Sequence, residues 1–141
     1  MKLIDNNAIV HWRKDRKQLK QIYFLTPEVV LEASLGSQKT RQEISDKMMP
    51  LEEEPIFDEA IYLSWFSIML NKHSQVSFFN MTGFGDISIL ATLHMLFEIF
   101  HVDENTKNAS FNVTTEDRKL ADKINAEFQN RVQILGYESL L

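Results

Sequence analysis

The sequence contains no cysteine, and this absence excludes three kinds of site. A disulfide framework, a thiolate metal site and a cysteine nucleophile are all unavailable, which fits a reducing compartment. Long apolar runs are also missing, because the longest, AIYLSWFSIML at residues 60–70, is too short to span a bilayer. Asp5 comes too early for a secretory apolar segment to form. We therefore expect a cytoplasmic protein with no membrane segment.

Positive charge is in short supply, since the chain of 141 residues has a formal net charge of −5. Taken alone, this charge argues against a nucleic-acid partner, but clustered acids can dominate a whole-chain sum. The apolar fraction of 44% and the charged fraction of 25% are typical of a folded domain. Because the length suits one domain and no internal repeat occurs, we expect a single domain over residues 1–141.

Short β-branched and aromatic runs alternate with helical patterns along the chain. Thr26 and Pro27 predict a helix start, with Thr26 as the N-cap residue. The polar stretch 37–59 predicts a short helix and a surface loop. We expect strands in KLID, QIYFL, QVSFF, SFNVT and VQIL, and helices at 8–20, 27–36, 57–71, from Asp86 onward and at 116–131. This alternation is typical of an α/β domain whose mainly parallel sheet is covered on both faces.

Acidic residues stand at the ends of several of these elements. Asp5 follows the first strand, Asp86 opens a helix after the third, and Asp117 follows the fourth. The carboxyl ends of parallel strands share one edge, where ligands bind, so these three acids should converge there. Glu32 lies in the helix after the second strand, and a similar but weaker argument places it at the same edge. It is spaced three residues from both Val29 and Leu35, so it shares their side of the helix.

Helix geometry favours an inward direction for Asp86. Positions 90 and 93 each fall within about 40° of position 86 around a helix, so Asp86 shares the stripe of Leu90 and Leu93. Structural alternatives remain for each acid taken singly. Asp86 suits a helix start, Thr114 with Asp117 matches a capping box, Asp5 suits a turn, and a lone Glu32 is usually solvated.

Several carboxylates in one partly desolvated cleft repel one another, which raises their pKa values and destabilises the fold. A divalent cation relieves this repulsion, and Mg²⁺ and Mn²⁺ prefer oxygen ligands. Two such ions would add +4 and bring the chain near −1, so an acidic chain remains compatible with a phosphate-bearing substrate.

These motifs together resemble those of the PIN-domain family. LIDNN resembles the opening D-x-N of the family, which ends here at Asn7, and LTPEVVLEA resembles the second motif, with Glu32 as its acid. GFGDISILATLHM is similar to the third motif, which begins at Asp86. NVTTED resembles the T-x-D pattern after the fourth strand, given by Thr115 and Asp117.

The resemblance covers nearly the whole chain and implies a three-layer α/β/α fold with a five-stranded, mainly parallel sheet. It implies hydrolysis of RNA phosphodiester bonds with Mg²⁺ or Mn²⁺, and many small members are dimeric toxins silenced by an antitoxin protein. The metal-binding and catalytic residues would be Asp5, Glu32, Asp86 and Asp117. Asn7 and Thr115 would orient these acids through hydrogen bonds.

Basic and aromatic residues near the first acid are candidates for RNA contact. The cluster that follows it is expected to bind phosphates, with a solvated helix face as the alternative; its members are Arg13, Lys14, Arg16 and Lys17. Trp12 and His11 are candidates for base stacking, with a core position as the alternative for Trp12. The helix that carries Trp65 and Phe66 suits either a dimer interface or ordinary core, and His94 has no evident partner.

Two rival functions remain open. The gap between Asp86 and Asp117 is longer than the family pattern, so a catalytically degenerate PIN-like interaction module is the alternative function. An acid-lined phosphatase or receiver domain is the second rival. The first strand lacks the D-x-D of one phosphatase class, and a receiver's early acid pair and late lysine are not convincing here.

Overall fold

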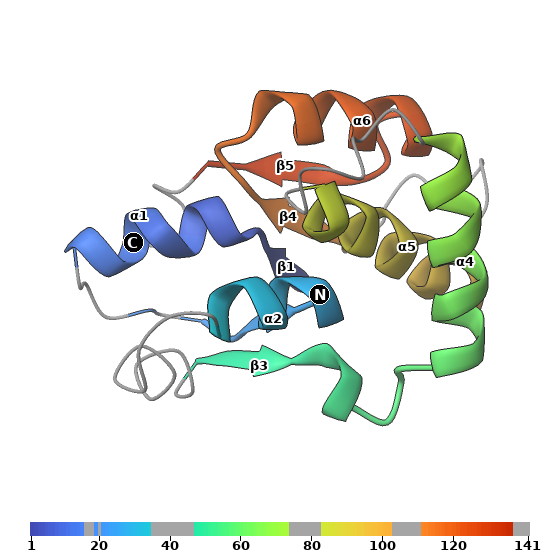
Figure 1. Cartoon of the computed structure of the whole chain (residues 1–141), viewed down its shortest axis with the longest axis horizontal. Coiled ribbons are helices and arrows are strands. Elements are labelled where there is room, and N and C mark those ends of the chain that lie inside the picture. Colours follow the sequence, from blue (N-terminus) through green and yellow to red (C-terminus); the bar gives the residue numbers. More distant parts are fainter. Residues whose placement is uncertain (16–18, 20, 35–46, 74–82, 103–110, 137–141) are drawn as a thin grey trace.

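The computed structural model describes residues 1–15, 19, 21–34, 47–73, 83–102 and 111–136 (Figure 1). Its elements, in chain order, are β1 (Lys2–Ile4), α1 (Asn6–Asp15), β2 (Tyr23–Leu25), α2 (Pro27–Ser34), β3 (Met48–Pro50), the 3₁₀ helix η1 (Leu51–Glu53), α4 (Glu59–Lys72), α5 (Phe84–Ile99), β4 (Asn112–Thr114), α6 (Arg118–Phe128) and β5 (Gln133–Leu135).

The five strands form one sheet in the order β3-β2-β1-β4-β5, and every neighbouring pair is parallel. Helices flank this sheet, so the architecture is the three-layer α/β/α fold that the sequence predicts. All strands point the same way, and their carboxyl ends therefore lie along one edge. The chain turns first toward β3 and later toward β5, so the direction of winding reverses between the central strands β1 and β4.

Helix α5 forms the middle of the core. It is apolar on all sides, a pattern typical of a buried helix, and from Ile87 to Phe97 only His94 is more than marginally exposed. Helices α4, α2 and α6 all contact α5. The predicted inward stripe is confirmed, since Leu90 and Leu93 are fully buried and Asp86 on the same side is largely covered.

The polar stretch before α4 differs from its prediction. Its described part, residues 47–58, contains the strand β3, in which Met49 pairs with Phe24 of β2, in addition to the short 3₁₀ helix η1, whereas residues 37–46 lie outside the described residues. Met48 and Leu51 are buried. The reason is tertiary, because these two apolar side chains are buried at the sheet's outer edge although most of the stretch 37–59 is polar.

The cap predicted for α2 is also wrong in its chemistry. Thr26 precedes the helix, and its carbonyl accepts the N–H of Val30. Its hydroxyl is buried and has no hydrogen-bond partner among the described residues, which include the start of α2, so it does not cap the helix. The strand predicted in QVSFF, at residues 75–79, and the helix end at Gly36 lie outside the described residues.

Candidate functional site

The carboxyl ends of β1 and β4 lie side by side at the point where the winding reverses. Ile4 of β1 is in register with Thr114 of β4, so Asp5 and Thr115 leave the sheet together. Ligands of open α/β sheets bind at such switch points. The structure thus brings two segments more than a hundred residues apart in sequence to one place.

Asp5 is almost completely buried and firmly held. Its backbone N–H donates to the carbonyl of Thr114 at 2.9 Å, its Oδ1 accepts the N–H of Asn6 at 2.8 Å, and its Oδ2 accepts the hydroxyl of Thr115 at 2.8 Å. Burial raises the pKa of Asp5, these hydrogen bonds oppose the rise, and the charge of Asp117 adds to it. The carboxylate is therefore fixed in orientation, but its ionised form is unfavourable in this buried position.

Asp86 lies in the first turn of α5, with its side chain 16% exposed. Burial raises its pKa to about 7, and the charges of Asp5 and Asp117 push in the same direction. Lys123 of α6 opposes the rise, with its Nζ 3.8 Å from Asp86 Oδ2. Asp5, Asp86 and Asp117 therefore interact as one group, which we call the acid cluster.

Asp117 is the N-cap residue of α6. Its Oδ1 accepts the N–H groups of Lys119 at 2.9 Å and Leu120 at 3.3 Å. The capping box considered from the sequence is wrong, because Thr114 lies within β4 and caps no helix. Both cap bonds use the same oxygen, so Oδ2 is the atom of Asp117 that would ligate a metal.

Thr115 and Asn7, the two residues predicted to orient the acids, form a connected set of hydrogen bonds with them. The Thr115 hydroxyl lies 2.8 Å from Asp5 Oδ2 and 3.3 Å from Asn7 Oδ1, and it accepts the N–H of Asp117 at 3.0 Å. Asn7 Oδ1 also accepts the N–H of Glu116 at 3.1 Å. Thr115 thus links two of the acids, while Asn7 fixes the backbone that carries Thr115.

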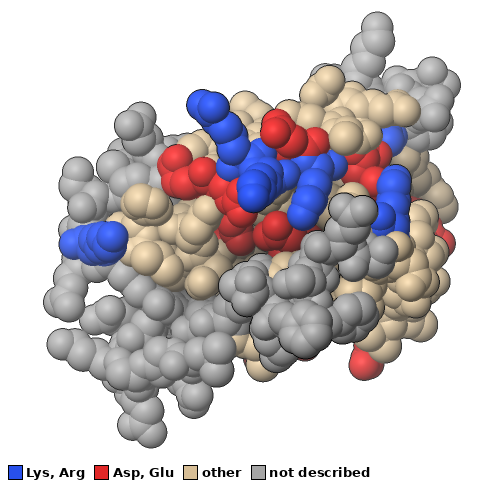
Figure 2. Space-filling view, turned by 45° about the horizontal axis from the view of Figure 1, so that its top comes forward, with Lys and Arg blue, Asp and Glu red and all other residues tan. Residues whose placement is uncertain are grey.

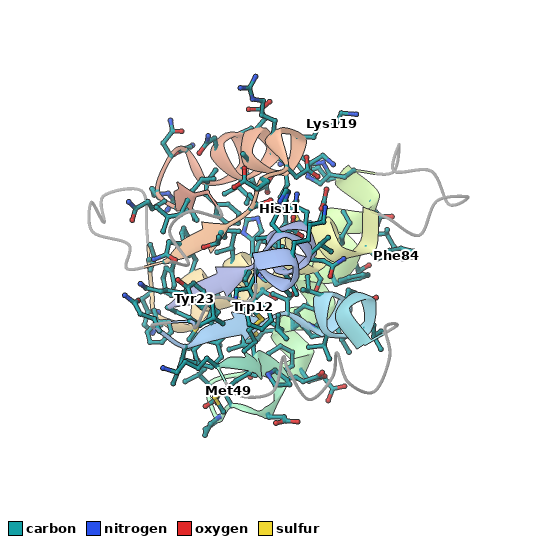
Figure 3. The ribbon with its side chains drawn as sticks, turned by 90° about the vertical axis from the view of Figure 1, so that its left-hand side faces the viewer. His11, Trp12, Tyr23, Met49, Phe84 and Lys119 are labelled. Atoms are coloured by element: carbon teal, nitrogen blue, oxygen red, sulfur yellow. The ribbon has the colours of Figure 1, made fainter. Side chains whose placement is uncertain are left out.

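Several predicted residues are not placed by the structure. Glu32 is in α2 and Arg13 in α1, but their side chains lie outside the described part, as do Arg16 and Lys17 entirely. Lys14 is exposed on α1. Trp12, next to His11 on α1 (Figure 3), is half-buried and packs against the core, in agreement with the core alternative.

A basic group that sequence reasoning missed lies on α6. Arg118 and Lys119 are exposed in its first turn, directly after Asp117, and Lys123 follows one turn later. Figure 2 faces the side of the molecule that bears α6 and shows Lys and Arg side chains interleaved with Asp and Glu; Lys119 reaches outward in Figure 3. The sequence signal was present, since helix N-termini attract phosphate, but the earlier basic run was more conspicuous.

His94 has the partners that the sequence did not reveal. Its ring stacks on Trp65 with centroids 4.1 Å apart, and its Nε2 lies 2.8 Å from Glu127 Oε1. Burial lowers the pKa of His94, although Glu127 opposes this. The ammonium of Lys72 contacts the same carboxylate at 2.6 Å. These contacts join α4, α5 and α6, so His94 and Trp65 are part of the packing.

The donor chemistry of the acid cluster fits a hard divalent cation. All three side chains offer carboxylate oxygens, and the raised pKa values of Asp5 and Asp86 mean that a positive charge placed between them would be stabilising. Within the described residues, no three acidic or histidine side chains already surround a single ion position.

Comparison with known proteins returns no match among family models, curated proteins or solved structures. Within the part of the chain that the structure describes, no helix is both long enough and apolar enough to cross a membrane.

Proposed function

We propose that this protein is a metal-dependent endoribonuclease of the PIN type. The observation that carries the proposal is the acid cluster at the β1/β4 switch point, where Asp5, Asp86 and Asp117 share one electrostatic field. These acids come from distant segments, and the PIN-like motifs contain all of them. A structural role for each acid alone does not explain why they meet.

Each member of the acid cluster would contribute oxygen ligands to Mg²⁺ or Mn²⁺. Glu32 would add a further carboxylate from α2, either to a second ion or to the attacking water. The bound ion would lower the pKa of a water molecule and stabilise charge on the phosphate. Burial makes Asp5 and Asp86 strong ligands, since an unneutralised charge in this site is unfavourable.

The chain's own residues prepare the site. Thr115 donates to Asp5 Oδ2 and therefore favours its ionised form, which is the form that binds metal. Lys123 supplies a positive charge beside Asp86 when no ion is bound. Metal binding would weaken this contact, because the ammonium and the ion compete for one carboxylate.

RNA would approach over the start of α6. Arg118 and Lys119 are exposed there, and the first backbone N–H groups of the helix carry partial positive charge. Lys14, which is exposed on α1, would add a further phosphate contact, and Arg13, Arg16 and Lys17 are near it in sequence. Local positive charge of this kind offsets the net negative charge of the chain.

The resemblance extends the proposal to a cytoplasmic toxin silenced by an antitoxin protein, and to a homodimer. Exposed apolar side chains on α4 support an interface, since Leu63 is 53% and Ile68 is 46% exposed. Trp65 stacks on His94 within the same chain, so an interface on α4 would use other residues.

Cleavage of a structured RNA in Mn²⁺ tests the proposal, with Asp117→Asn compared with the control Asp122→Asn. Asp117 precedes α6 and Asp122 lies within the same helix, but Asp122 is exposed and outside the acid cluster. Loss of a partner of a metal ligand already costs about 10–100-fold. We therefore expect Asp117→Asn to lose at least about 100-fold in rate, and Asp122→Asn to keep wild-type activity.

EDTA should abolish cleavage and added Mn²⁺ should restore it. Equal rates for Asp117→Asn and the wild type would refute the catalytic role of the acid cluster. If the wild type neither cleaves RNA nor binds Mg²⁺ or Mn²⁺ at millimolar concentration by calorimetry, the degenerate interaction module is the better description.

A further inference from the structure

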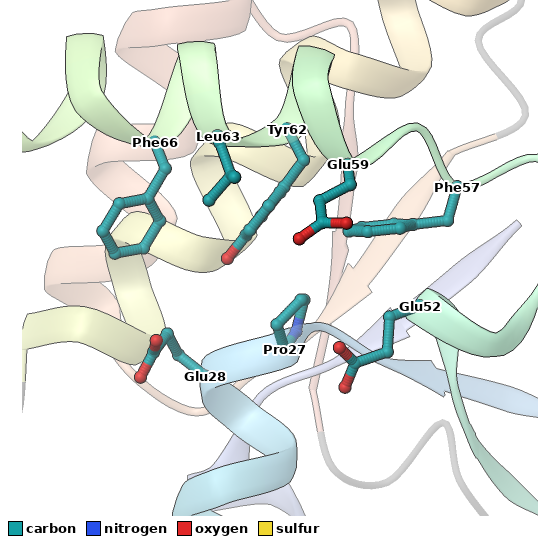
Figure 4. Close-up of a pocket in the computed structure, with 8 residues that line it drawn as sticks. All are labelled: Pro27, Glu28, Glu52, Phe57, Glu59, Tyr62, Leu63 and Phe66. Atoms are coloured by element: carbon teal, nitrogen blue, oxygen red, sulfur yellow. The ribbon is translucent and has the colours of Figure 1, made fainter.

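A second concave site lies beyond the acid cluster, between α4 and the start of α2 (Figure 4). Its volume is about 430 Å³, within the usual range for ligand pockets. Helix α4 contributes one wall, and Pro27, Glu28 and Glu52 form the opposite side. We call this cavity the α2/α4 pocket.

Aromatic rings line the α4 side of the pocket. The Tyr62 ring lies 5.2 Å from that of Phe57 and 5.8 Å from that of Phe66, measured between centroids. Tyr62 is buried, and its hydroxyl lies 2.8 Å from Ser88 Oγ. The same oxygen of Ser88 accepts the N–H of Glu28 at 3.3 Å. The wall is therefore tied to both α5 and α2, and is rigid enough to serve as a preformed surface.

The charge of the pocket is of one sign. Glu28, Glu52 and Glu59 line it, and its described lining residues include no lysine or arginine. Among the described residues none of these three carboxylates has a salt bridge. Burial raises the pKa of Tyr62 to about 12, with the charges of Glu28 and Glu52 adding to the rise. The described lining of the pocket thus combines aromatic rings with negative charge that no described basic side chain neutralises.

We propose that the α2/α4 pocket receives an arginine side chain from a protein partner. A guanidinium group pairs with carboxylates through directed hydrogen bonds and stacks on aromatic rings, so one group satisfies both features of the pocket. An RNA phosphate would be repelled by Glu28, Glu52 and Glu59.

A protein source fits the surface around the pocket better than a free small cation. Leu63 lies at the pocket and is 53% exposed, and Leu31, one turn after Pro27 on α2, is 58% exposed. These leucines offer apolar contacts to residues on either side of a bound arginine. The proposal does not depend on RNA cleavage, because none of the pocket's residues belongs to the acid cluster.

Binding of two short peptides tests this site. The probes are acetyl-Gly-Leu-Arg-Leu-Gly-amide and the same peptide with citrulline, which keeps the shape of arginine but carries no charge. Binding is measured by calorimetry on the full chain, without divalent metal and at low salt. The citrulline peptide should bind at least tenfold more weakly than the arginine peptide. Blocked arginine alone, acetyl-arginine-amide, should bind more weakly than the arginine peptide.

Two neighbouring glutamates provide a matched pair of variants. Glu52 lines the pocket, whereas Glu53, also exposed on η1, does not. Glu52→Gln should weaken binding of the arginine peptide about threefold, as expected for the loss of one exposed ion pair. Glu53→Gln should leave the affinity for this peptide unchanged. Equal effects of the two variants, equal binding of the two peptides, or no binding of either peptide would overturn the proposal. Equal affinity for acetyl-arginine-amide and the peptide would overturn the protein source.

Discussion

Replacement of Asp86 by asparagine should stabilise the metal-free protein, although it removes a proposed metal ligand. Asparagine keeps the shape of the side chain and removes the charge. The pKa of Asp86 is raised from 3.8 to about 7. At about 1.36 kcal/mol per pKa unit, the ionised carboxylate costs the folded state about 4 kcal/mol above pH 7. The neutral variant avoids this cost.

The direction in which stability changes with pH follows from proton linkage. The folded protein holds a proton on Asp86 over a range in which the unfolded chain has lost it, so wild-type stability falls as pH rises from about 4 to 7. The raised pKa of Asp5 acts in the same direction. The advantage of Asp86→Asn should therefore be small at pH 4 and reach about 4 kcal/mol at pH 8, or on the order of 10 °C in melting temperature.

Urea unfolding at pH 4.5 and pH 8, in EDTA, measures this difference, with Asp122→Asn as the exposed control. Adding Mg²⁺ at pH 8 should raise the stability of the wild type more than that of Asp86→Asn, because ligand binding stabilises only the protein that binds. An Asp86→Asn protein that is no more stable than the wild type at pH 8 would refute the electrostatic reasoning. A stability difference independent of pH would do the same.

Two further changes probe the groups around the acids. Thr115→Ala removes the donor to Asp5 Oδ2, so it should cost about 2 kcal/mol at pH 8 and less at pH 5, in urea unfolding, whereas Thr115→Ser should retain most of the stability. Lys123→Met keeps the apolar stem but removes the cation beside Asp86. Calorimetry at pH 8.5 should then show Mg²⁺ binding about fivefold tighter, because the competing charge is gone; unchanged or weaker binding would contradict this competition.

The convergence of the acids could be predicted because it depends on a rule of topology. Asp5 and Asp117 each follow a strand, and parallel strands end at the same edge. The direction of Asp86 followed from helical periodicity, since Leu90 and Leu93 had to face the core. Neither inference needed the exact position of any loop.

Other features could not be predicted because they arise from tertiary contacts. The strand around Met48 has only three residues in a polar segment, and it forms because Tyr23 and Phe24 offer a free sheet edge. The position of Lys123 beside Asp86 depends on how α6 packs against α5. Within the described part of the chain the buried hydroxyl of Thr26 has no hydrogen-bond partner, although local propensity favours it as a cap.

The acid cluster and the α2/α4 pocket are both negative, yet the two proposals assign different cations to them. Asp86 and Ser88 are both in the first turns of α5, about 200° apart around the helix, so one faces the acid cluster and the other faces the wall of Tyr62. The acid cluster offers converging carboxylates and no described aromatic contact, which suits a small, strongly hydrated ion. The pocket adds aromatic rings, which a hydrated ion cannot use but a planar guanidinium can. Divalent metal and arginine should therefore bind at separate places, and the shared first turns of α5 are the element through which either could affect the other.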